Sequence, residues 1–211
     1  GNDSPIYGLK SQAEILVQAK AAEEAGARRF CLVSQGRGPK YASAKSTEFE
    51  QILETVRNII SETSIKPCCA LGEVTVEQAK ALREAGVTRY NHNLESSEQF
   101  FPNVATTHTW QDRVETIRNL KSAGIQACTG GIMGLGETWE DRVDMALSLR
   151  DLEVESVPLN LLNPRSGTPL GDNNRLEPYD ALKAIAIFRM ILPQQILRYA
   201  GGREAVMGEL Q

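Results

Sequence analysis

Apolar and polar positions along the chain change period repeatedly, from the spacing of an amphipathic helix to that of a short strand and back. Residues 11–25 predict an amphipathic helix, with Ser11 as its N-cap and Gly26 directly after its end. An apolar run over 29–34 predicts a strand, and a Gly/Pro-rich loop covers 35–40. The order continues, with further helices expected over 47–62, 75–85, 109–123, 138–151 and 178–192, and further strands over 65–71, 90–95, 125–129, 156–162 and 196–200.

An Ala-Gly pair separates helix from strand at three places, Ala25-Gly26, Ala85-Gly86 and Ala123-Gly124. Such alternation is typical of βα units and a parallel sheet, either doubly wound or closed as a (β/α) barrel. We count six strands and expect a single α/β domain over 1–211, since no change of composition marks a linker. The chain begins with a helix and ends soon after a strand, so an eight-stranded barrel would be partial, open where its first and last strands are missing.

The segment Tyr90–Glu95 alternates polar and apolar side chains. In a strand, Asn91, Asn93 and Glu95 would share one face, and Tyr90, His92 and Leu94 the other. Two amides and a carboxylate are costly to bury unless they are hydrogen-bonded, which a ligand rich in hydroxyls, amides or ammonium groups would do. Pairing with neighbouring strands or with water is the alternative.

Four cysteines lie on the predicted strands: Cys31 on the first, Cys68 and Cys69 on the second, and Cys128 on the fourth. Adjacent Cys68 and Cys69 must point to opposite faces, so at most one of them looks into a barrel. Buried cysteines often serve only as small apolar side chains. Three thiols that converge from different strands would instead form a soft ligand set for an iron–sulfur cluster or zinc.

A glycine-rich turn over Gly130–Glu137 follows the fourth strand and precedes a helix. It predicts backbone close to a ligand, with free amides at a helix N-terminus. Its spacing is not GxGxxG, and a tight βα turn explains it equally well.

Composition narrows the class of protein. The 211 residues carry a net charge of −4, with 41% hydrophobic residues, enough for a sizeable core. No long run of one charge sign occurs, which argues against nucleic acid or an anionic membrane as a partner. There is no apolar run of about 20 residues that could span a bilayer and no signal-peptide pattern, so we expect a cytoplasmic protein.

Several motifs together resemble those of the biotin synthase family, which belongs to the radical S-adenosylmethionine (SAM) enzymes. They occur in the family's order and approximate spacing over essentially the whole chain. The matching segments are Tyr90–Glu95, Gly130–Glu137, Val157–Asn160 with Gly167–Leu170, and Ala200–Glu204.

The resemblance implies a (β/α)8 barrel and conversion of dethiobiotin to biotin. In that family a [4Fe–4S] cluster reductively cleaves SAM, the resulting 5′-deoxyadenosyl radical abstracts hydrogen from dethiobiotin, and a [2Fe–2S] cluster supplies sulfur. Three cysteines and an arginine hold the second cluster, and the matching positions are Cys31, Cys68, Cys128 and Arg198. Arg29 would lie beside that cluster.

The resemblance also implies contacts to SAM and substrate. Asn93 and Glu95 would hold the SAM ribose hydroxyls, although the family usually has Asp where Glu95 stands. Ile132 would meet the adenine through its backbone. Asn91 and Asn160 would hydrogen-bond the ureido ring of dethiobiotin. Implied partners are SAM, dethiobiotin, an electron donor such as flavodoxin, and a second subunit in a homodimer.

The chain departs from the family in one respect. The CxxxCxxC loop that supplies the [4Fe–4S] cluster is absent, and no cysteine precedes Cys31. We therefore expect this chain to correspond to the middle six βα units of a biotin synthase and to make no biotin alone.

Three alternatives stay open. One is another radical SAM enzyme, such as a hydrogenase maturase or methylornithine synthase, which need not keep three cysteines and an arginine. A second is an aldolase- or isomerase-type barrel, which would require a phosphate-binding glycine turn late in the chain or a catalytic lysine at the end of a strand. The third is a non-catalytic barrel fragment.

Overall fold

The computed structural model describes residues 8–41 and 47–210. Contacts divide the chain into two compact units: one covers the part up to His92 together with Thr116–Ala127, and the other Asn93–Glu115 together with the part from Cys128 onward. The registered strand pairs within each unit are parallel, and helices alternate with the strands. The chain is therefore an α/β protein, as predicted.

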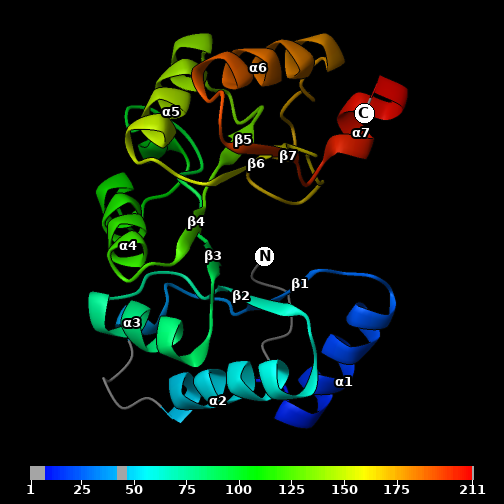
Figure 1. The fold of residues 1–211 in the computed structure, drawn as a ribbon. Helices are drawn as coiled ribbons and strands as arrows, with labels where there is room; N and C mark the ends of the chain where they lie inside the picture. Colours follow the sequence, from blue (N-terminus) through cyan, green and yellow to red (C-terminus); the bar gives the residue numbers. More distant parts are fainter. Residues whose placement is uncertain (1–7, 42–46, 211) are drawn as a thin grey trace. The chain divides into compact units, whose positions relative to one another are not determined.

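The first unit has a parallel sheet in the order β1-β2-β3, with β4 next to β3. Figure 1 shows α1 and α2 side by side in this unit, near β1 and β2. The elements are α1 (Gln12–Glu24), β1 (Arg29–Val33), the 3-10 turn η1 (Pro39–Tyr41), α2 (Thr47–Glu62), β2 (Lys66–Ala70), α3 (Val76–Ala85), β3 (Arg89–Asn91), α4 (Trp110–Ser122, which starts in the second unit) and β4 (Gln126–Cys128, whose last residue belongs to the second unit).

The core of the first unit lies between its helices and one face of its strands. Apolar residues three or four positions apart bury one side of α2 against this sheet, among them Leu53, Val56 and Ile59. Tyr90 is fully buried, and its hydroxyl accepts from Leu71 N–H at 3.0 Å and donates to Gly72 O at 2.8 Å. This side chain thereby fixes the turn that follows β2.

The second unit is built around β6 (Ser156–Leu161). Cys128 pairs with Ser156, and Gly131 pairs with Leu159 at the same sequence offset, so β4 and β5 run along one edge of β6 as an interrupted line. The strand β7 also pairs with β6. The remaining elements are η2 (Phe101–Asn103), β5 (Gly131–Met133), α5 (Trp139–Asp151), α6 (Pro178–Ile191), β7 (Ile196–Tyr199), α7 (Arg203–Met207) and η3 (Gly208–Leu210), with α5 and α6 side by side (Figure 1).

Most predicted elements are confirmed within one residue at each end, and two differ. The described residues form seven strands rather than six, because Gly131–Met133 forms β5 and the turn narrows to residues 134–137. The strand predicted over 90–95 ends at Asn91, because the chain then leaves the ladder and meets it again through a single bridge between Glu95 and Gly131. The prediction of a single domain stays a prediction.

Within the described ranges, no helix is both long and apolar enough to cross a membrane.

Candidate functional site

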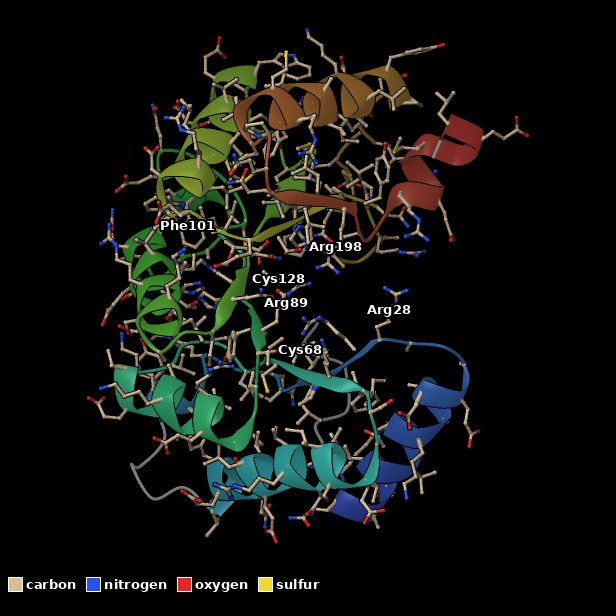
Figure 2. All side chains as sticks on the ribbon, viewed as in Figure 1. Arg28, Cys68, Arg89, Phe101, Cys128 and Arg198 are labelled. Atoms are coloured by element: carbon tan, nitrogen blue, oxygen red, sulfur yellow. The ribbon has the colours of Figure 1, made fainter. Side chains whose placement is uncertain are left out.

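Cys128 and Arg198 meet in the second unit, although 70 residues separate them in sequence. Arg198 Nη2 donates to Cys128 Sγ at 2.8 Å, and Cys128 is 2% exposed. Figure 2 shows the cysteine on β4 and the arginine on β7, the strands that flank β6. A guanidinium that donates to a buried sulfur stabilises negative charge on it.

Ser156 provides a second polar neighbour for the same sulfur. It stands opposite Cys128 in the β4–β6 register, is fully buried, and its hydroxyl oxygen lies 3.9 Å from Cys128 Sγ. The sulfur therefore lies between a cation and a hydroxyl rather than in a purely apolar core.

Cys31 and Cys68 form the corresponding pair in the first unit. They are direct partners in the parallel register of β1 and β2, and Cys68 in turn pairs with Arg89 on β3. Figure 2 labels Cys68 and Arg89 on their adjacent strands. Arg29 lies two residues before Cys31, and its Nη1 donates to Thr88 Oγ1 at 3.0 Å. Two thiols and two arginines thus occupy neighbouring positions of one sheet face.

Cys69 faces the opposite side of β2. It is fully buried in the hydrophobic core, whereas Cys68 is half-buried, so the expectation that the two point to different faces is confirmed. Burial, with a smaller contribution from the neighbouring Cys68, raises the pKa of the Cys69 thiol far above its ordinary value. The structure therefore places the Cys69 thiol in the hydrophobic core.

Glu95 presents a buried carboxylate in the second unit. Its backbone φ of 71° lies in the left-handed region, which residues other than glycine rarely adopt. Within the described part of the chain, its Oε2 is buried without a hydrogen-bond partner, and Oε1 lies 3.7 Å from Arg113 Nη1. Burial raises the pKa of this carboxyl, although the Arg113 cation and a hydrogen bond from Asn93 act in the opposite direction.

Arg113 is held by several contacts around this carboxylate. Its Nη1 donates to Asn93 O at 2.8 Å, and its Nε donates to His108 Nε2 at 3.0 Å. Its guanidinium carbon lies 5.5 Å from the centre of the Phe101 ring (labelled in Figure 2), and Phe101 packs edge-on against His108. Sequence reasoning did not single out Arg113, since its only signal was a basic residue on a helix near the predicted ligand loop.

Gly130–Ile132 brings backbone against the Asn93–Glu95 segment. Gly130 N–H donates to Asn93 Oδ1 at 3.2 Å, and Ile132 N–H donates to Glu95 O at 2.9 Å. A Cβ on Gly131 would lie 2.6 Å from Glu95 O, so only glycine fits there. A backbone contact between Ile132 and adenine would therefore use the carbonyl oxygen.

Glu137 shapes the turn after β5, a role that sequence reasoning missed. Its carboxylate accepts from Gly134 N–H at 2.9 Å and from Leu135 N–H at 2.7 Å. Arg142 Nε donates to it at 2.7 Å, and both side chains are less than a tenth exposed. The sequence signal was an acidic residue three positions after a turn glycine, just before a helix.

Asn160 joins two backbone segments. Its Nδ2 donates to Gly131 O at 3.2 Å, and its Oδ1 accepts from Gly201 N–H at 2.9 Å. Within the described part of the chain, these two contacts leave one amide hydrogen and one oxygen lone pair for another partner. Asn91 ends β3 in the first unit and is half-buried.

The structure thus brings the predicted site residues together in groups, each within one unit. Cys31 pairs with Cys68, Cys128 with Arg198, and Asn93 and Glu95 with the Gly130–Ile132 backbone. Among the described residues, no group of three or more His, Cys, Asp or Glu side chains lies in position to hold a metal ion. The four-residue cluster ligand set therefore stays a prediction.

Comparison with protein families divides the chain into two matches. Residues 2–149 match the radical SAM superfamily, and residues 158–211 match the biotin and thiamin synthesis associated domain.

Individual relatives resemble the chain over its whole length. It is 80% identical to the biotin synthase of Rippkaea orientalis and 79% identical to that of a Picosynechococcus strain, each over all 211 residues. The chain spans 57% and 58% of the length of these two proteins. The resemblance predicted from the motifs is confirmed.

Solved structures of lower identity share the fold. Methylornithine synthase matches with a TM-score of 0.79 at 20% identity, over 92% of this chain and 56% of that one. A maturase of the [FeFe]-hydrogenase matches with a TM-score of 0.77 at 19% identity, over 93% of this chain and 46% of its own. These likenesses show the fold alone, and they confirm the α/β fold class expected from the sequence.

Proposed function

Since the chain belongs to the radical SAM superfamily, we propose that it forms the SAM-binding and sulfur-inserting part of a biotin synthase. Identity of 80% over all 211 residues to one biotin synthase supports this substrate class. The alternatives of an aldolase or isomerase barrel find no support in these relatives.

The contact between Arg198 and Cys128 carries the proposal. A buried cysteine whose sulfur accepts from an arginine at 2.8 Å fits an anionic sulfur site. Together with Cys31 and Cys68, these residues would hold the [2Fe–2S] cluster. Arg29 lies two residues before Cys31 on β1, and Arg89 pairs with Cys68. Their positive charges would suit a negatively charged iron–sulfur cluster beside the two thiols.

Glu95 supports the assignment of SAM. Its buried Oε2 has no partner among the described residues, and a ribose hydroxyl is a donor that would satisfy it. Asn93 orders the same segment through its contact with Gly130 N–H. The Ile132 carbonyl is an acceptor for the amino group of adenine.

When bound, SAM and the two clusters would supply the radical and the sulfur atom. The residues of this chain would bind these groups and the substrate and hold them in orientation. Asn160 and Asn91 would hydrogen-bond the ureido ring, and Asn160 is already fixed by Gly131 O and Gly201 N–H. The buried Glu137–Arg142 pair keeps the Gly134–Leu135 turn in place beside the strand that carries Ile132.

A hybrid protein tests the function. The 211 residues would replace the matching part of the Rippkaea orientalis biotin synthase, in bacteria that lack their own enzyme. Growth without biotin is the expected result, and a Cys128→Ser hybrid should fail to grow. A folded hybrid that makes no biotin from dethiobiotin would overturn the proposal.

Anaerobic iron–sulfide reconstitution of the hybrid tests the ligands. We expect the Cys128→Ser hybrid to lose about two irons per chain relative to the parent hybrid, the content of a [2Fe–2S] cluster. Cys69→Ala is the matched control, since Cys69 packs in the core and should leave the iron count unchanged. Equal iron counts in parent and Cys128→Ser would contradict the cluster assignment.

The wider setting is part of the same proposal. We infer a cytoplasmic homodimer that takes electrons from a donor such as flavodoxin. The 211-residue chain alone should make no biotin, because its sequence holds no CxxxCxxC.

A further inference from the structure

Cys31 and Cys68 stand directly opposite each other on neighbouring parallel strands. Their Cα atoms are register partners, between the pairs Arg29–Lys66 and Val33–Ala70. Neighbouring strands lie about 4.8 Å apart. That spacing falls inside the range of about 4.4–6.8 Å between the Cα atoms of a disulfide.

Both thiols lie on the same face of the sheet. Side chains alternate across a strand, and the intervening partners Leu32 and Cys69 are buried in the core on the other face. Cys31 is exposed and Cys68 is half-buried, so a reagent can reach the first thiol and the second can then attack it. Among the described strands, β1 pairs with β2.

We propose that Cys31 and Cys68 form a reversible disulfide when the chain meets an oxidised low-molecular-weight disulfide such as glutathione disulfide. The Cys31 thiolate attacks one sulfur of the reagent, a mixed disulfide forms, and one glutathione thiolate leaves. The Cys68 thiolate then attacks the Cys31 sulfur and releases the second glutathione thiolate. Two protein thiols are oxidised, losing two protons to solvent, and one glutathione disulfide is reduced.

This cross-link would join Cys31 and Cys68, two of the proposed cluster ligands, to each other. A chain oxidised in this way cannot offer Cys31 and Cys68 to iron, so oxidation and cluster loading exclude each other. The cross-link itself does not depend on the proposed function, because it rests on the register of β1 and β2 alone.

Thiol counting and peptide mapping test the proposal on the 211-residue chain. After treatment with glutathione disulfide and unfolding, we expect free thiols to fall from four to two, with no glutathione retained. Fragmentation of the peptide between adjacent Cys68 and Cys69 should place the link on Cys68. Dithiothreitol should restore all four thiols.

Matched variants test which two thiols form the cross-link. In Cys31→Ser or Cys68→Ser, the remaining partner should retain one glutathione per chain instead of forming the cross-link. Cys69→Ala should still form it, and if that variant fails to fold, peptide fragmentation of the unaltered chain decides the same question. Stable glutathione adducts on Cys31 or Cys68 of the unaltered chain, or a link to Cys69 or Cys128, would overturn the proposal.

Discussion

Arg198 on β7 donates to the sulfur of Cys128 on β4, across the strand β6 with which both strands pair. The sulfur therefore has a fixed cationic neighbour at a position set by three strands. Substitution of Arg198 tests the role of this cation separately from that of the thiol.

Arg198→Met should leave the iron content of the reconstituted hybrid close to that of the parent, because three thiolates remain. It should change the visible absorption of the cluster, because a cation and hydrogen-bond donor beside the sulfur is lost. Absorption spectra of both hybrids at equal iron content provide the measurement. Superimposable spectra would place Arg198 away from the cluster.

Glu95→Gln should weaken SAM binding roughly tenfold, since a neutral amide oxygen accepts less strongly than a carboxylate. Isothermal titration of the hybrid with SAM measures this Kd. Glu84→Gln, at an exposed position on α3, is the matched control and should bind as the parent does. Unchanged affinity in Glu95→Gln would remove Glu95 from the SAM site.

The stability of the ligand-free chain should depend on the ionisation of Glu95. Burial raises the pKa of this carboxyl in the folded state. Between its ordinary and raised pKa the folded state binds more protons than the unfolded state, so the free energy of unfolding falls as pH rises. Glu95→Gln should therefore gain stability relative to the parent as pH rises through this range. The gain should vanish below the ordinary carboxyl pKa. Urea unfolding of both proteins at several pH values measures it. A gain that shrinks as pH rises would contradict the prediction.

Glu137→Gln should cost about 3–5 kcal/mol of unfolding free energy, because Arg142 is left buried without its anion. The double variant Glu137→Gln with Arg142→Met should cost less than the sum of the two single variants. Urea unfolding of the parent, the two single variants and the double variant completes this double-mutant cycle. Strictly additive costs would mean that the buried ion pair does not couple the turn to α5.

Tyr90→Phe should lower the free energy of unfolding by about 1–3 kcal/mol, because Leu71 N–H and Gly72 O lose their shared partner. Tyr179→Phe is the control, since Tyr179 is 76% exposed. Thermal or urea unfolding of both variants makes the comparison. Equal stabilities would show that water replaces the buried hydroxyl.

Local signals in the sequence predicted the helices well. Ser11 and Thr75 cap α1 and α3 through their side chains, and Gly26 and Gly86 follow the helix ends with positive φ. These contacts span only a few residues, so spacing and residue type are enough to reveal them.

Long-range pairing was harder to foresee. Gly131–Met133 was predicted as part of a turn because it begins with glycine, yet pairing with β6 makes it a strand. The direct opposition of Cys31 and Cys68 depends on strand register, which a sequence does not encode locally. The roles of Arg113 and Glu137 likewise depend on partners that only folding brings near.

Asn160 has a consequence for recognition, because its amide cannot flip. The Gly201 N–H requires an oxygen on one side, and the Gly131 carbonyl requires an N–H on the other. The backbone has therefore set the polarity of the side chain before any ligand arrives. What remains is one donor and one acceptor side by side in a fixed order, and only a molecule that presents the complementary pair in the matching direction can satisfy both.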